Sequence, residues 1–127
     1  MTQVFPIMSQ LSQAVSIHPY FKINPGCVDN FKSIISQFVE RTQPEENCHY
    51  YDFSICGEMA FCREAYADAD AVLFHLENVG AQIEATGECS EMIRLEIHGP
   101  AEELAKLKAP LAELPVEYYE HIAGVQR

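Results

Sequence analysis

Apolar residues in the first third of the chain change from a strand-like to a helix-like spacing. Residues 14–23 alternate, so that one face of the expected strand carries Val15, Ile17, Phe21 and Ile23. Pro19 interrupts this strand and lacks an N–H, which predicts a bulge or an edge position. From residue 27 to about residue 42 apolar positions recur at helical intervals and form one stripe. The segment Asn-Pro-Gly between the two predicts a turn.

The middle of the chain reads as a hairpin followed by a second helix. Residues 48–56 and 59–66 both have strand-like patterns, and Gly57-Glu58 between them predicts a tight turn. Asp68 or Asp70 is suited to cap the helix that follows, because a short polar side chain accepts hydrogen bonds from its first turn. We expect that helix to end at Gly80 or Gly87.

The last third adds a strand, a short helix and a further strand. Residues 91–99 alternate, Pro100 favours a helix start that runs to about residue 109, and residues 116–121 alternate again. The order predicts an α+β protein with a ferredoxin-like β-α-β-β-α-β core and an added C-terminal α-β unit. We expect one domain over residues 1–127, with the core at 14–99 and the extension at 100–127. The final strand needs a sheet edge, either its own or, as we favour, that of a partner subunit.

Charge and composition exclude several classes of partner. The formal net charge is −11, with 8 basic and 19 acidic residues, so we expect neither nucleic acid nor an anionic membrane surface as a partner. No apolar run approaches the length of a membrane span, and the N-terminus lacks the basic residues of a secretory signal, which favours a cytoplasmic location. The five cysteines include no C-x-x-C pair, and no pair of histidines has metal-ligand spacing. We therefore expect no disulfide framework and no metal.

Several segments in a fixed order resemble the antibiotic biosynthesis monooxygenase superfamily. They are "FKINPGCVDNF", "EENCHYY" and "REAYADADAVLFHL", which cover roughly half of the chain. The residues that fall at matching places are Pro25, Gly26, Glu45, Cys48, Tyr51, Glu64, Tyr66, Ala71 and His75. The resemblance implies a homodimer in which two ferredoxin-like sheets form an α/β barrel, with a ligand pocket between sheet and helices.

The resemblance also implies a choice between several activities. The family includes oxygenases that act without a cofactor on quinols and aromatic polyketides, and relatives that degrade haem. The haem-degrading branch uses a set of Asn, Trp and His, and the corresponding positions here hold Pro19, His75 and Ala85. The chain has no tryptophan at all. Haem degradation is therefore not expected, and no cofactor is expected either.

His75 is the main candidate for catalysis. An imidazole exchanges a proton near neutral pH, as deprotonation of a phenol or hydroquinone requires, and the family pattern places a histidine here. The alternative is a core histidine that merely fills space with its hydrogen bonds satisfied. Glu64 is the second candidate: it could orient His75 or a substrate hydroxyl, or it could instead pair with Arg63 or Arg94 across the sheet.

Tyr51 and Tyr66 are candidates for substrate binding, and core packing of both rings is the alternative. Two functions follow from these residues. The first is a cofactor-free monooxygenase in which His75 helps to deprotonate a quinol or aromatic substrate. The second is a dimeric protein, associated with stress or small-ligand binding, that has no chemistry of its own. Both include self-association, because strands with apolar residues on both sides would leave a large apolar face bare in a monomer.

Overall fold

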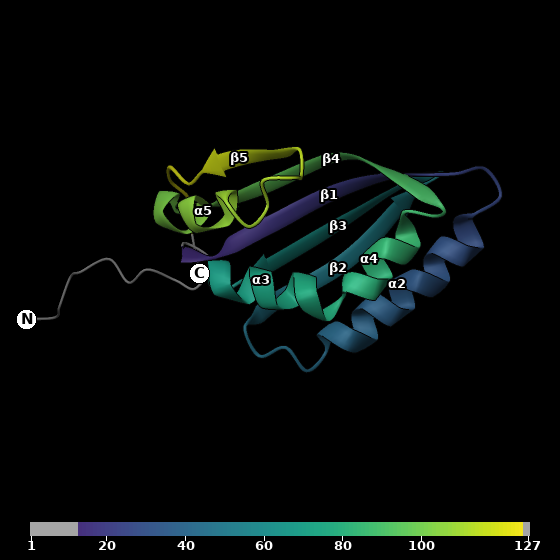
Figure 1. Cartoon of the computed structure of the whole chain (residues 1–127), viewed down its shortest axis with the longest axis horizontal. Coiled ribbons are helices and arrows are strands. Elements are labelled where there is room, and N and C mark those ends of the chain that lie inside the picture. The colour runs from purple at the N-terminus through teal and green to yellow at the C-terminus, as the bar shows by residue number, and fades with distance from the viewer. Residues whose placement is uncertain (1–12, 126–127) are drawn as a thin grey trace, which may run out of the picture.

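The computed structural model describes residues 13–125 (Figure 1). Its elements are β1 (Val15–Ile23), α2 (Val28–Thr42), β2 (Cys48–Cys56), β3 (Met59–Tyr66), α3 (Ala69–Asn78), α4 (Gly80–Thr86), β4 (Ser90–Gly99), α5 (Ala101–Lys108) and β5 (Val116–Glu120). They form one five-stranded sheet in the order β2-β3-β1-β4-β5. The first four strands pair antiparallel and have the ferredoxin-like arrangement. The predicted α+β fold class is confirmed.

Pro19 lies in a central strand. β1 pairs with β3 on one side and with β4 on the other, so the edge position considered for Pro19 is wrong. The bulge alternative fits better, because the register between β1 and β4 shifts between Tyr20 and Phe21. A bulge lets the strand absorb a residue that cannot donate a hydrogen bond to its neighbour.

The second helical segment is divided in two. Asp68 caps α3, and its Oδ1 accepts a hydrogen bond from the backbone N–H of Ala71 at 2.9 Å. Helical geometry is interrupted at Val79, and α4 begins at Gly80. The expected helix to Gly80 or Gly87 is therefore two helices, of which α3 carries His75 and α4 carries Ile83.

The two faces of the sheet have different environments. In Figure 1, α2, α3 and α4 lie along one side of the sheet, and α5 lies near β4 and β5. Side chains from β1 and β3 that point toward the helices, such as Val15, Ile23 and Cys62, are fully buried. Neighbouring positions such as Ser16, His18 and Tyr20 point to the opposite face and stay partly exposed. We call this opposite side the open face.

The C-terminal strand joins its own sheet. β5 pairs in parallel with β4, with Val116 opposite Leu95 and Tyr118 opposite Ile97. The sequence left two pairings open and favoured the partner's sheet, and this preference is corrected, because α5 returns the chain to the β4 edge. Within residues 13–125, every helix is too short or too polar to cross a membrane.

Candidate active site

A largely apolar cavity of about 110 Å³ lies between the sheet and the helices. Its wall combines residues of β1 to β4, of α2, α3 and α4, and of the segment after α5. Only four of the lining residues, Tyr51, Glu64, His75 and Thr86, carry a hydroxyl, carboxyl or imidazole group. Concave apolar sites with a few convergent polar groups are the usual form of a small-molecule site.

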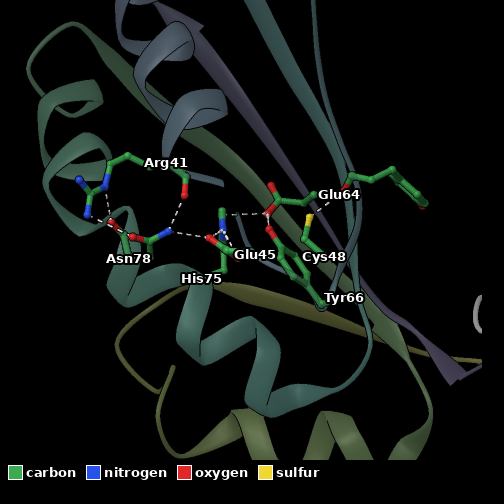
Figure 2. A network of polar contacts seen from close by, with 8 residues as sticks. Arg41, Glu45, Cys48, Glu64, Tyr66, His75 and Asn78 are labelled. Atoms are coloured by element: carbon green, nitrogen blue, oxygen red, sulfur yellow. Dashed lines mark hydrogen bonds and ion pairs between the residues drawn. The ribbon is translucent and has the colours of Figure 1, made fainter. Parts of the chain in front are cut away.

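His75 lies between two buried carboxyl groups (Figure 2). Its Nδ1 is 2.9 Å from Oε2 of Glu45, and its Nε2 is 3.6 Å from Oε1 of Glu64. The side chains of His75, Glu45 and Glu64 are exposed by only 2%, 5% and 6%. The first contact is a hydrogen bond, whereas 3.6 Å is too long for one. The helical phase of α3 thus turns the imidazole inward rather than toward solvent.

Glu45 is held from its other side by Asn78. The Nδ2 of Asn78 donates to Oε2 of Glu45 at 2.8 Å and to the carbonyl of Arg41 at 2.8 Å. Arg41 in turn donates from Nε to the backbone carbonyl of Asn78 at 2.8 Å. A carboxylate in this place accepts a hydrogen bond from the Nδ1–H of His75, and in the tautomer that carries its proton on Nδ1 the nitrogen Nε2 is the free acceptor. The network therefore orients Nε2 toward Glu64.

Glu64 is a carboxyl group that holds its proton strongly. Burial raises its pKa, and this effect is larger than the opposing effects of His75 and of the hydrogen bond from Tyr66. The hydroxyl of Tyr66 donates to Oε1 of Glu64 at 2.5 Å. The carboxyl group of Glu64, whose protonated form is favoured by burial, thus faces Nε2 of His75 at the cavity wall.

The four residues expected from sequence meet at this place, with different roles. Tyr51 lines the cavity, and its ring lies 5.0 Å from that of His75. Tyr66 also lies 5.0 Å from the His75 ring, yet it is completely buried and is absent from the cavity wall. It therefore contacts Glu64 rather than the space for a ligand. Glu64 makes its contacts with Tyr66 and His75, and the alternative pairing with Arg63 or Arg94 does not occur.

Sequence reasoning missed the roles of Glu45 and Asn78. Glu45 was among the residues that match the family pattern. Its position in the loop before β2 did not predict a hydrogen bond to His75 on α3. Asn78 lies three residues after His75, a spacing that places both on one side of a helix. That spacing was the available signal for Asn78.

The cysteines near the site are poor nucleophiles. Burial, followed by the charge of Glu45, raises the pKa of Cys48 to about 12. Burial likewise raises the pKa of Cys62, which is fully buried beneath the helices. Because the thiolate is the reactive form, neither residue suits covalent catalysis. All five cysteines are free thiols, as expected from the sequence.

Comparisons with known proteins show that this chain is similar in sequence and structure to a solved protein. No protein-family model matches the chain, and no curated protein matches it. The crystal structure of MupZ from Pseudomonas fluorescens is 36% identical in sequence, over 91% of this chain and 95% of MupZ, with a TM-score of 0.87. The chain belongs to the MupZ family. Sequence identity of 36% over 91% of the chain is evidence of a family relationship and not only of a shared fold.

More distant structures share the fold. A conserved protein from Methanosarcina mazei is 19% identical over 71% of this chain and 95% of its own, with a TM-score of 0.64. A crystal structure named antibiotic biosynthesis monooxygenase is 17% identical over 65% of this chain and 92% of its own, with a TM-score of 0.58. This MupZ relative thus has the fold of a protein named antibiotic biosynthesis monooxygenase, as the resemblance in its sequence implied.

Proposed function

We propose that this protein is an enzyme that exchanges a proton between a small apolar molecule and the pair formed by Glu64 and His75. The observation that carries the proposal is the bracketing of His75 by two buried carboxyl groups, one of which lines the cavity. A space-filling core histidine needs its polar atoms satisfied, and here Nε2 has no partner within hydrogen-bond distance among residues 13–125. Such a nitrogen, next to a cavity, is suited to bind a substrate.

The gap between Nε2 of His75 and Oε1 of Glu64 is where we place the reacting group. An oxygen atom at ordinary hydrogen-bond distance from both atoms fits beside a pair separated by 3.6 Å. A substrate hydroxyl there would donate its proton to Nε2 and accept a hydrogen bond from protonated Glu64. The hydrogen bond from Nδ1 to Glu45 would then stabilise the imidazolium that forms, as a carboxylate does in hydrolase triads.

We propose monooxygenation of a quinol or electron-rich aromatic compound as the reaction. His75 would remove the proton of the substrate, and the resulting anion would supply the electrons that reduce dioxygen. A ring CH of the phenol, which is a CH₂ in the keto tautomer, would become a carbonyl: CH₂ and one O₂ give C=O and one water, which balances without an added reductant. No cofactor is then required. The fold shared with a protein named antibiotic biosynthesis monooxygenase supports this choice.

A second candidate is an acid–base reaction without oxygen, such as an isomerisation or an addition within one molecule. The specific observation in its favour is Glu64. Burial raises the pKa of this carboxyl group, which favours the protonated form that can donate a proton. Deprotonation before oxygenation needs only the base, whereas a paired acid and base serve a reaction that moves a proton from one atom to another.

Oxygen uptake with a panel of hydroquinones and naphthols tests the first candidate. We expect the wild type to consume dioxygen, and His75→Ala and Glu64→Gln each to lower the rate about 10²–10⁴-fold, the usual contribution of a general acid or base. His98→Ala and Glu96→Gln are matched controls, because they form a histidine–glutamate pair on the open face, 3.1 Å apart. These controls should retain the wild-type rate.

The same assay separates the alternatives. Substrate loss under nitrogen that depends on Glu64 and His75 would favour the acid–base reaction and exclude oxygenation. Tight binding of the same compounds with no conversion in either atmosphere would contradict both reactions and favour the non-catalytic ligand-binding protein. Equal losses of rate in the variants of both pairs would show that the effect is not specific to the cavity.

A further inference from the structure

Among the described residues, no lysine or arginine lines the cavity. Seven of the eight lysine and arginine residues lie within residues 13–125, and none of them lines it. The eighth is Arg127, and residues 1–12 contain no lysine or arginine. Several of the seven have acidic partners elsewhere, such as Lys22 with Glu58 and Lys106 with Glu103. A negatively charged group that entered the cavity would therefore meet no lysine or arginine among the described residues.

The polar groups of the wall form a single spot. Tyr51 and Glu64 are direct neighbours across β2 and β3, and the Tyr51 ring lies 5.0 Å from the His75 ring. The fourth polar residue, Thr86, has its hydroxyl occupied, since it donates to the carbonyl of Ile83 at 2.7 Å. The other described residues that line the cavity have apolar side chains. Among the described side chains, a ligand therefore finds hydrogen-bond partners for its oxygen atoms at one place.

The cavity is small and opens through an apolar rim. Its volume of about 110 Å³ corresponds to roughly ten water-sized groups, since one water needs about 10–15 Å³ on this scale. Three of its lining residues, Ile83, Met92 and Leu114, are also exposed at the surface by 36%, 36% and 43%. They come from α4, β4 and the segment after α5, and mark where the cavity meets solvent. A longer molecule would extend through this rim.

We infer that the cavity selects an uncharged, mainly hydrocarbon molecule, or an end of one with on the order of ten non-hydrogen atoms, that presents one oxygen function to Glu64 and His75. The inference rests on the proposed function in placing the reacting oxygen at this pair. It adds that carboxylate and sulfonate analogues of the same skeleton are rejected, and that compounds with several separated hydroxyl groups bind poorly.

The physical reason is the loss of hydration. An isolated carboxylate that leaves water for an apolar site without a counter-charge is strongly disfavoured, and a hydroxyl without a partner costs less but still a few kcal/mol. Here the one described lining residue that can become positively charged is His75, and it already lies between the carboxyl groups of Glu45 and Glu64, so it is a poor counter-charge for an anion. A neutral molecule with its one oxygen at the polar spot avoids both costs.

A set of three naphthalenes tests the inference without reference to turnover. The set is 2-naphthol, which is neutral with one hydroxyl, 2-naphthoate, which is an anion, and naphthalene, which has no oxygen. Equilibrium dialysis, read by the absorbance of the ring, gives each dissociation constant. High ionic strength screens the net charge of −11. We expect 2-naphthol to bind at least about tenfold more tightly than 2-naphthoate, and naphthalene to lie between them.

Two variants place the discrimination at the cavity. Met92→Lys adds a cation at the rim, and should strengthen 2-naphthoate binding about tenfold relative to 2-naphthol. Ile93→Lys is its matched control, because the adjacent side chain is 52% exposed and does not line the cavity. It should leave the ratio unchanged.

Three results would overturn the inference: equal affinity of the wild type for 2-naphthol and 2-naphthoate, no binding of either compound, or equal shifts in the two lysine variants. These results are distinct from failure of the proposed function. Selective binding of 2-naphthol without oxygen uptake or any other conversion would contradict the proposed function and leave the selectivity established.

Discussion

The two sides of the sheet carry the same pair of residue types in opposite environments. Beneath the helices, His75 is exposed by only 2% and contacts Glu45 at 2.9 Å. On the open face, the side chain of His98 is 41% exposed and contacts Glu96 at 3.1 Å. The His98 ring also stacks on Tyr119 with a centroid distance of 4.5 Å. The distances are nearly equal, so the difference between the pairs lies in their hydration.

That difference reverses the behaviour of the carboxyl groups. Burial raises the pKa of Glu64, whereas the hydrogen bond from His98 lowers the pKa of Glu96. Burial thus favours the protonated form of Glu64, whereas the contact with His98 favours the ionised form of Glu96 on the open face. Exposed ion pairs contribute about 0–1 kcal/mol to the free energy of unfolding, so the pair formed by His98 and Glu96 contributes little to stability. A histidine beside a glutamate becomes a candidate for catalysis only where water is excluded.

The largest contrast between the faces should come from removing a phenyl ring. Phe31→Ala removes a fully buried ring that packs 5.4 Å from Phe21, and should lower the free energy of unfolding by about 3–5 kcal/mol. Phe61→Ala removes a partly buried ring from the open face, where its main neighbour is Tyr20 at 4.8 Å, and should cost about 1 kcal/mol. Urea denaturation at low protein concentration measures both.

The same pair of variants tests self-association. We expect a homodimer that covers the open face, because Tyr20, Phe61 and Tyr119 would otherwise expose much apolar surface to water. Sedimentation at micromolar concentration should then give a dimer for the wild type and a weaker one for Phe61→Ala. A wild-type protein that sediments only as a 14.3 kDa species would contradict the dimer, and equal urea midpoints of the two variants would contradict the contrast in burial.

Removal of one hydroxyl should give the next largest contrast. Tyr66→Phe deprives buried Glu64 of its 2.5 Å hydrogen bond, which should cost about 1–3 kcal/mol. Tyr119→Phe deprives Arg94 of a 3.0 Å bond on the open face, and should change stability by about 0.5 kcal/mol or less. Thermal denaturation of both variants tests this. A Tyr66→Phe variant as stable as Tyr119→Phe would mean that Glu64 is satisfied without Tyr66.

The two glutamates should give pH dependences of opposite sign. The folded-state pKa of Glu64 is raised above 4.5, so the folded state binds more protons and stability falls as pH rises from 4.5 toward that pKa. Glu64→Gln should reduce this fall. The folded-state pKa of Glu96 is lowered below 4.5, so its contribution is present above pH 4.5 and is lost as pH falls.

Glu96→Gln should therefore reduce the loss of stability in acid and leave the alkaline side unchanged. Denaturation midpoints measured from pH 3 to pH 9 distinguish the two cases. Similar pH profiles for Glu64→Gln and Glu96→Gln would contradict the difference in hydration between the two faces.

The smallest effect should come from His18 on the open face. Burial, and then the positive charge of nearby His98, lower the pKa of His18 below 6.5. The unfolded state then binds more protons, so stability falls as pH drops through 6.5. His18→Gln should lessen this fall slightly, as midpoints at pH 5.5 and pH 7.5 would reveal. A variant with the same pH slope as the wild type would place the cause elsewhere.

Strand positions were predictable from local pattern. The alternation in residues 48–56 and the turn at Gly57 needed no knowledge of distant contacts, because side-chain period and turn chemistry are local properties. Gly57 adopts φ +61°, the left-handed conformation for which glycine is favoured. Gly80 was one of the two ends expected for the helix that carries His75, and α3 does end just before it, at Asn78. The separate short helix α4 was not predicted.

The sequence by itself determined the order of the strands, a helix cap at Asp68 or Asp70, and the candidates His75 and Glu64, because periodicity and residue chemistry are local properties of the chain. Only the tertiary structure decided which nitrogen of His75 faces which carboxyl group. Glu45, Glu64 and His75 belong to three different segments, and their distances depend on how the loop before β2, strand β3 and helix α3 pack together. The pKa of Glu64 depends in turn on the water that this packing excludes.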